Sequence, residues 1–177
     1  MTNPGELVEE AAMQLNAAFA KFRTQNSVLA HEFDAIKLQA SIFQFEIGMQ
    51  YAGLIAIEPK GFALRVALKG LAHMLFSYEE ARGSLLKRLR RLAESRQIEL
   101  DEAALRATRR ELKTVLESIA TWRTLRNKAA AHYDFESDEQ FEQVAAVEEP
   151  AVFQAATAVL KANMEFLKLL KAVGAGK

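Results

Sequence analysis

"FALRVALKGLAHMLFSYEEARGSLLKRLRRLAESR", residues 62–96, decides the fold class of this chain. Leucines recur through it mostly three or four positions apart, at Leu64, Leu68, Leu71, Leu75, Leu85, Leu89 and Leu92. Apolar residues at this spacing lie on one face of an α-helix. The spacing therefore predicts a helix much longer than the average of about 11 to 12 residues. Within it, Gly70 and Gly83 indicate close packing or a kink.

The residues before this stretch show the same period. They predict a first helix from Gly5 to about Gln25, with Ser27 as the N-cap of a second helix. The two helices are expected to form an antiparallel hairpin. The first helix carries one buried stripe, formed by Leu7, Ala11, Leu15, Ala18, Phe19 and Phe22.

The second helix is expected to end at "EPKG", residues 58–61. Pro59 disfavours a helical conformation at Glu58, and Gly61 supplies a turn. The apolar residues assigned to this helix are Val28, Phe33, Ile36, Leu38, Ile42, Phe43, Phe45, Ile47 and Met49.

A further long helix is expected after the quoted stretch. Asp101 is a good N-cap for it, and its apolar period continues to the region of Arg126. Its apolar positions are Leu105, Leu112, Leu116, Ile119 and Leu125.

Two more helix starts are readable near the C-terminus. Ser137 and Gln140 have the spacing of a capping box, which predicts a short helix. Pro150, at a first-turn position, begins the last helix, which is expected to end near Val173.

Composition agrees with an all-α fold. Half of the 177 residues are apolar and only three are proline. No run rich in Val, Ile and Thr alternates with a period of two, so nothing predicts a sheet. We expect a single domain over residues 1–177, built as an up-and-down bundle of long antiparallel helices, with an N-terminal helix within 1–27 and a disordered tail at 174–177.

Charge and cysteine content bound the function. Lys plus Arg and Asp plus Glu are 23 each, and there is no Cys. The absence of Cys excludes disulfides, thiolate metal sites and cysteine nucleophiles. Residues 82–128 have a balance of +7 and residues 129–149 a balance of −7. The sign therefore changes inside one short stretch.

The compartment is expected to be the cytoplasm. Glu6, Glu9 and Glu10 stand where a signal peptide would have a basic start. The most apolar window, Met49–Ile57, is far shorter than the roughly 20 residues of a membrane span. We therefore expect it to be a buried helix segment, and we expect no membrane partner.

Polar residues gather where the fourth long helical pattern ends, in "TWRTLRNKAAAHYDFESDEQ", residues 121–140. RNA can be cut without a metal when its 2′-OH attacks the adjacent phosphate. That reaction needs a group that moves protons near neutral pH and a cation that holds the phosphate, roles that suit His132 and Arg126. Arg also grips phosphate oxygens in a fork that Lys cannot reproduce.

The stretch "LRNKAAAHYD" resembles the R-x(4–6)-H signature of HEPN domains, and is closest to their abortive-infection branch. Here five residues separate Arg126 from His132, and Asn127 holds the polar position after the Arg. The resemblance implies an all-helical module that acts as a metal-independent endoribonuclease and leaves a 2′,3′-cyclic phosphate. His132 would transfer protons, Arg126 would bind phosphate, and Asn127 would orient one of them.

The resemblance also implies partners and a setting. Two copies would form a homodimer with their motifs facing across one cleft. The setting would be a bacterial defence or toxin–antitoxin system, in which a nucleotidyltransferase-type antitoxin is a partner of some family members. No cofactor is implied.

Helix geometry constrains such a site. Six positions along an ideal helix place Arg126 and His132 about 120° apart around the axis and about 9 Å apart along it. A straight helix would not bring the two side chains together. Either the helix breaks before His132, or a second chain completes the site.

Other interpretations of the motif stay open. Arg126, Asn127, Lys128 and His132 would also suit the last turn of a helix, where cations are favoured by the helix dipole. The chain would then be a structural dimer. A third interpretation is a non-catalytic module that binds RNA, a nucleotide or a protein through the same cleft.

Basic residues outside the motif are weaker candidates for RNA contacts. The run "LLKRLRRLAESR" has one apolar and one positive helical face, and a solvated face is the simpler interpretation. An RNA-backbone track is the alternative, in which binding falls with salt. The residues assigned to it are Lys87, Arg88, Arg91, Arg123 and Lys128.

No metal site is predicted. His31, His73 and His132 fall on different expected helices, and the chain lacks the Glu-x-x-His pairs of di-iron bundles. His73 is expected in the core or an interface. The acidic stretch "DFESDEQFE" lacks the Gly and Glu that a calcium loop requires, so we expect a solvated loop and helix cap.

Overall fold

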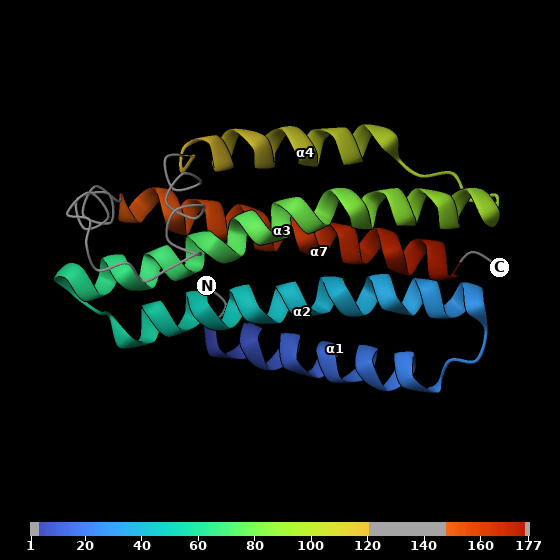
Figure 1. Ribbon diagram of the computed structural model, residues 1–177, viewed down its shortest axis with the longest axis horizontal. Helices are drawn as coiled ribbons and strands as arrows, with labels where there is room; N and C mark the ends of the chain where they lie inside the picture. Colours follow the sequence, from blue (N-terminus) through green and yellow to red (C-terminus); the bar gives the residue numbers. More distant parts are fainter. Residues whose placement is uncertain (1–3, 121–147, 176–177) are drawn as a thin grey trace, which may run out of the picture.

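The computed structural model describes residues 4–120 and 148–175, and this part of the chain consists of five packed helices without a strand (Figure 1). The all-α expectation is confirmed for these residues. The helices are α1 (Pro4–Thr24), α2 (Val28–Ile57), α3 (Gly61–Ser95), α4 (Glu102–Glu117) and α7 (Glu149–Ala175).

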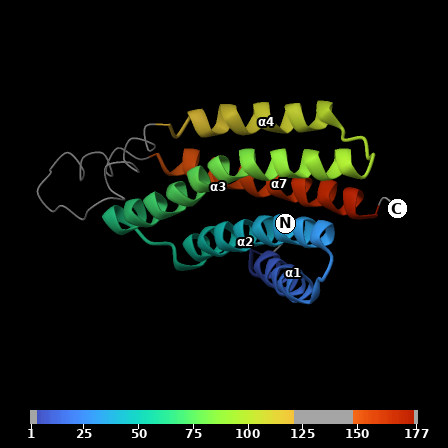
Figure 2. The same ribbon diagram turned by 45° about the vertical axis from the view of Figure 1, so that its right-hand side comes forward.

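The helices lie side by side and alternate in direction (Figures 1 and 2). In the middle, α2, α3 and α7 pack on one another. On one side, α1 packs on α2 and completes the expected antiparallel hairpin, while on the other side α4 packs on α7. Each outer helix therefore keeps one long face away from the bundle.

Local sequence explains the end of α2. Glu58 has a left-handed backbone, with φ 47° and ψ 53°, and its N–H donates to the Leu54 carbonyl at 3.1 Å. Pro59 makes a helical Glu58 unfavourable, so the chain turns here as expected. At the next residue but one, Gly61 adopts a positive φ of 61°, which glycine tolerates without strain.

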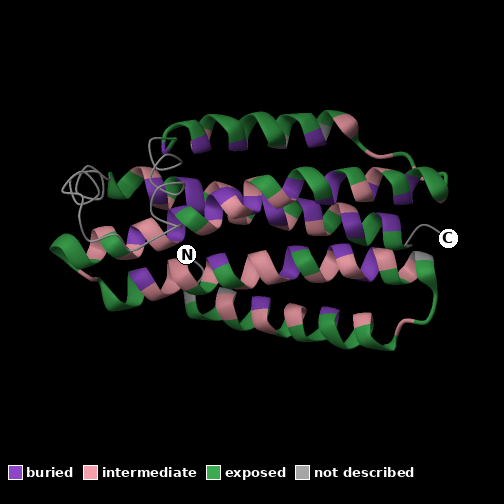
Figure 3. Ribbon diagram, in the orientation of Figure 1, coloured by how far each residue is buried: buried purple, intermediate pink, exposed green. Residues whose placement is uncertain are grey.

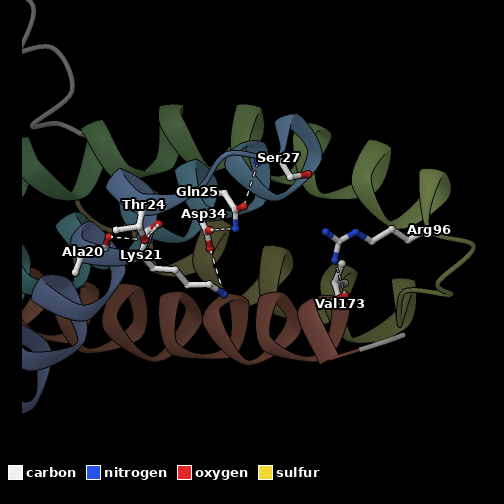
Figure 4. Close-up of polar contacts among 8 residues, drawn as sticks. All are labelled: Ala20, Lys21, Thr24, Gln25, Ser27, Asp34, Arg96 and Val173. Atoms are coloured by element: carbon white, nitrogen blue, oxygen red, sulfur yellow. Dashed lines mark hydrogen bonds and ion pairs between the residues drawn. The ribbon is translucent and has the colours of Figure 1, made fainter.

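The turn between α1 and α2 is held by side chains (Figure 4). Ser27 precedes α2 as expected, but its side chain makes no capping hydrogen bond. Instead the Gln25 side chain accepts a hydrogen bond from the Ser27 N–H and donates to the buried Asp34 carboxylate at 3.3 Å. The Lys21 ammonium lies 3.6 Å from the same carboxylate, so α1 and α2 are joined through Asp34.

The core has two buried clusters along the bundle. One contains Tyr78, Leu116, Ile119 and Val152, and the other contains Phe33, Leu89, Phe166 and Leu170, each with further apolar residues. Full burial of one such side chain stabilises the fold by about 1.5–3 kcal/mol.

Between the clusters, the buried Asn163 amide of α7 donates to the Ala40 carbonyl at 2.8 Å and to Gln44 Oε1 at 2.9 Å, both on α2. These bonds fix the register of α7 on α2. A buried amide nitrogen left without partners would cost free energy, and these two bonds avoid that cost, although the buried Oδ1 of Asn163 has no partner among the described residues.

Two expectations of burial are wrong. Phe19, assigned to the buried stripe of α1, is 50% exposed, and the window expected to be buried contains the exposed side chains of Met49, Ile55 and Ile57. In Figure 1, α1 covers only the N-terminal part of α2, so the last turns of α2 have fewer neighbours. Exposed residues are correspondingly common there (Figure 3).

The expected run of α4 to the region of Arg126 is also wrong, because α4 ends at Glu117. The N–H groups of Ile119 and Ala120 bond to carbonyls three residues earlier, which tightens the chain into a turn. The helix expected after Ser137 lies outside the described residues. At the C-terminus α7 begins beside Pro150 and extends to Ala175, two residues beyond Val173.

No helix in the described ranges is both long enough and apolar enough to cross a bilayer.

Candidate functional site

The motif lies between two described helices. Arg126, Asn127 and His132, together with Arg123 and Lys128, lie outside the residues that the structure describes. The structure therefore gives the flanks of the motif, at Ala120 and Glu148, and the helices that precede and follow it.

Both flanks are anchored in the same core. Leu116 and Ile119, at the end of α4, and Val152 and Ala155, near the start of α7, belong to one buried cluster. These helix ends lie at the end of the bundle that also carries the α2–α3 connection (Figures 1 and 2). The two described flanks of the motif therefore lie at the same end of the bundle.

The basic run of α3 is only partly available to a ligand. Leu85, Leu86, Leu89 and Leu92 are buried, and Lys87 and Arg91 are exposed, as expected for a helix with one apolar and one positive face. The guanidinium of Arg88, however, donates from Nε to Glu32 Oε1 at 2.6 Å. This bond lowers the pKa of Glu32, and it already compensates the charge of Arg88.

Arg90, on the same helix, binds Glu102 with two nitrogens. Its Nε and Nη2 donate to the two carboxylate oxygens at 2.7 and 2.8 Å, across the α3–α4 turn. The pKa of Glu102 is lowered by these hydrogen bonds. The pair fixes the first turn of α4 against α3.

One arginine of α3 is buried. Arg82 of α3 is 6% exposed, and its Nε has no hydrogen-bond partner. One helical turn earlier, Tyr78 is fully buried, and burial raises the pKa of its hydroxyl to about 12. Burial also lowers the pKa of Arg82; the neighbouring Tyr78 opposes this effect, and the charge of Arg109 on α4 adds slightly to it. The spacing of four between Tyr78 and Arg82 placed both on the leucine face, which could have revealed the pair.

The outer face of α4 carries four cations that the sequence reasoning did not group together. Arg106, Arg109, Arg110 and Lys113 are all exposed. They stand at i, i+3, i+4 and i+7, the spacing that places residues on one helical face. The same periodicity that assigned the apolar stripe could have found them.

The described histidines form no site. His31 is exposed and stacks on Phe22 with ring centroids 4.4 Å apart, while His73 is exposed on α3 and so is not a core residue. Within the described ranges, no three His, Cys, Asp or Glu side chains gather closely enough to hold a metal ion.

A groove of about 590 Å³ lies at the end of the bundle where the motif flanks emerge. Side chains of Tyr51, Leu54 and Leu64 line it together with Glu149 and Phe153 of α7. Tyr51 and Phe153 meet edge to face, with centroids 5.4 Å apart. The groove has both apolar and charged lining residues, because Glu58 and Lys60 also border it.

Comparisons of the chain with models of protein families, with curated proteins and with solved structures found no match.

Proposed function

We propose that this protein is a metal-independent endoribonuclease of the HEPN type. The observation that carries the proposal is the constellation Arg126-Asn127-(x)4-His132 in a segment that joins two long helices of an all-α bundle. Support comes from the residue types, from their resemblance to the HEPN signature, and from the buried helix ends at Ile119 and Val152 that anchor both flanks.

The chemistry assigns one role to each residue. His132 accepts the proton of a ribose 2′-OH, whose oxygen then forms a bond to the adjacent phosphorus. The bond from phosphorus to the 5′ oxygen breaks, and that oxygen receives a proton from a histidine. The products are a 2′,3′-cyclic phosphate and a 5′-OH. Arg126 holds the phosphate oxygens as negative charge accumulates on them, and Asn127 orients Arg126 or His132.

The arrangement of the active cleft is part of the proposal. In a straight helix Arg126 and His132 would be about 9 Å apart along the axis, so one helix alone does not unite them. We place the cleft between two copies of the chain, where each contributes an Arg and a His. Ala129, Ala130 and Ala131 leave room for such an approach.

The biological setting rests on the resemblance alone. It is a bacterial defence or toxin–antitoxin system in the cytoplasm, with cellular RNA as substrate and a neutralising antitoxin protein as partner.

The decisive experiment is RNA cleavage in excess EDTA. Purified wild-type protein and the His132→Ala variant are incubated with mixed cellular RNA, and the chemistry of the new 3′ ends is determined. We expect cyclic-phosphate ends with the wild-type protein and none with the variant. His73→Ala is the matched control, because His73 is exposed on α3 and should leave cleavage unchanged.

Arg126 separates this proposal from the non-catalytic alternative. Arg126→Lys keeps the charge but loses the two-pronged grip on phosphate, so cleavage should fall while binding of uncleaved RNA persists. A binding module would lose affinity with Arg126→Ala and would show no cleavage in any variant. Equal RNA patterns with wild-type and His132→Ala proteins would reject the nuclease.

A further inference from the structure

The positive face of α4 gathers four exposed cations within about two turns of one helix. Its members are Arg106, Arg109, Arg110 and Lys113, which are all exposed, whereas Leu105, Leu112 and Leu116 of the same helix are buried. Ten to eleven ångströms of helix, roughly, separate the first cation from the last, since each residue advances about 1.5 Å. Figure 3 shows α4 exposed along its outer side.

Neighbouring carboxylates do not neutralise the three arginines. Glu102, one turn before Arg106, has both oxygens bound by Arg90, and Arg106 donates only to the Glu102 backbone carbonyl at 3.0 Å. Glu111 lies 3.5 Å from Lys161 of α7 instead. Within the described residues, Arg106, Arg109 and Arg110 make no ion pair, whereas Lys113 lies 3.6 Å from Glu117.

A second observation lies beneath this face. Arg82 of α3 is buried, which lowers its pKa; Tyr78 opposes this effect, and the charge of Arg109 makes a smaller contribution in the lowering direction. Two guanidinium groups that repel each other, one of them nearly excluded from water, raise the free energy of the folded chain. An anion bound at Arg109 would offset this repulsion.

We propose that the outer face of α4 binds the phosphate backbone of single-stranded RNA. The identity of the polyanion rests on the proposed ribonuclease function, while the location of the surface rests on α4 itself. Arginine forks suit phosphate oxygens. No aromatic residue occurs within α4 to stack on bases, so recognition here is independent of base sequence.

This surface differs from the track expected on α3. There the Arg88 charge is paired with Glu32, and Lys87 and Arg91 remain. Two matched double variants compare the helices, because each removes two exposed cations one turn apart. They are Arg106→Gln/Arg110→Gln on α4 and Lys87→Gln/Arg91→Gln on α3. Glutamine has a helix propensity close to that of Arg and Lys, so both helices should persist.

Binding is measured by fluorescence anisotropy with a short labelled RNA whose 2′ hydroxyls are methylated, so that cleavage by 2′-OH attack is blocked in every protein. Each phosphate contact on a single strand contributes about 0.7 to the slope of log affinity against log salt. We expect the α4 double variant to lower this slope by about 1.4, and Arg110→Gln alone to lower it by about 0.7. Circular dichroism of each variant confirms that helix content is retained.

The outcomes separate this inference from the proposed function. A lower slope for the α4 variants and an unchanged slope for the α3 variant support it, even if unmodified RNA is never cut. Equal effects of both double variants would assign binding to overall charge and overturn it, even if His132-dependent cleavage is found. Absence of RNA binding by the wild-type chain, or binding to anionic lipid vesicles in preference to RNA, would also overturn it.

Discussion

Phe33 meets Gly174 so closely that no other residue fits opposite its ring. A Cβ built on Gly174 would lie 2.7 Å from Phe33 Cζ, a distance that real Cβ atoms do not tolerate. The ring is held on its faces by cations, with Lys21 Nζ 5.9 Å and Arg96 Cζ 5.6 Å from its centroid. Arg96 also donates to the Val173 carbonyl at 3.4 Å (Figure 4). Helices α1, α2 and α7 and the C-cap residue of α3 thus meet at one aromatic side chain.

Two glycine substitutions should therefore act in opposite directions. Gly83, in the middle of α3, has nothing within 4 Å of a built Cβ, so Gly83→Ala should raise the free energy of unfolding by about 0.5–1 kcal/mol through backbone entropy. Gly174→Ala should lower it by about 1–3 kcal/mol, because the methyl group overpacks against Phe33. Urea denaturation measures both. A stabilising Gly174→Ala would show that the end of α7 shifts freely.

The burial of Tyr78 makes the stability of the fold depend on pH at alkaline values. Its pKa is raised to about 12 because burial disfavours the phenolate, although the nearby Arg82 acts in the opposite direction. A group whose pKa is raised by folding contributes stability below its unfolded pKa and loses that contribution as the pH rises through the folded value. The relevant window lies between the ordinary tyrosine value of about 10 and the folded value.

We therefore expect wild-type protein to lose more stability than Tyr78→Phe between about pH 9 and about pH 11, since the Phe variant has no phenol to ionise at this position. Denaturant unfolding of both proteins at the two pH values gives the difference. Identical losses in the two proteins would mean that water reaches the Tyr78 hydroxyl in the folded state.

At the scale of the helix, the sequence predicted where helices begin and end better than it predicted which side of each helix is buried. Pro59, Asp101 and Pro150 are local signals, and α2, α4 and α7 end or begin beside them. The exposure of Met49 and Ile57 was not predictable, because apolar residues occur on every side of α2 and no period distinguishes a covered face. No Gly or Pro stands at the end of α4, so no local sequence signal predicted that the helix ends there.

Contacts between residues that are distant in the sequence could not be predicted either. Arg88 and Glu32 are 56 residues apart, and nothing in the run around Arg88 shows that its charge is paired. Arg90 and Glu102 are only 12 residues apart, but their meeting depends on the α3–α4 turn. The candidate motif, by contrast, was visible because its residues are neighbours in the chain.

The α3–α4 turn offers a test of the Arg90–Glu102 pair. The lowered pKa of Glu102 means that the pair stabilises the fold above the ordinary glutamate pKa of about 4.3, and that this contribution is lost as the carboxylate is protonated. Both side chains are 42% exposed, so Glu102→Gln should cost no more than about 1 kcal/mol at pH 7. The cost should disappear well below pH 4.3, roughly.

Glu111→Gln is the matched control in the same urea titrations. Glu111 lies 3.5 Å from a single lysine nitrogen and is well exposed, so its substitution should cost less than that of Glu102. A Glu102→Gln cost that persists unchanged at acidic pH would mean that the charge of Glu102 is not the cause.

At the scale of the whole molecule, the bundle gathers the ends of the motif segment at one place. Ile119 and Val152 are buried in the same cluster, so the residues that flank 121–147 on both sides are anchored in one part of the core. The sequence predicted the helices that form this part of the core, but not how they pack, because packing depends on side chains far apart in the chain. The proposed homodimer depends on contacts between two chains, which the apolar periodicity of one sequence does not predict.

A cleft shared by two copies makes a prediction that a cleft within one chain does not. His132→Ala and Arg126→Ala proteins should each be inactive, but a mixture that exchanges subunits should regain part of the cleavage. The mixed dimer still places one Arg126 and one His132 around the cleft, which is enough for proton transfer and phosphate binding. Cleavage is followed in EDTA as the mixing ratio is varied, and subunit exchange is followed by energy transfer between labelled chains. Efficient exchange without any recovered cleavage would place Arg126 and His132 of the same chain in one site, with the helix broken between them.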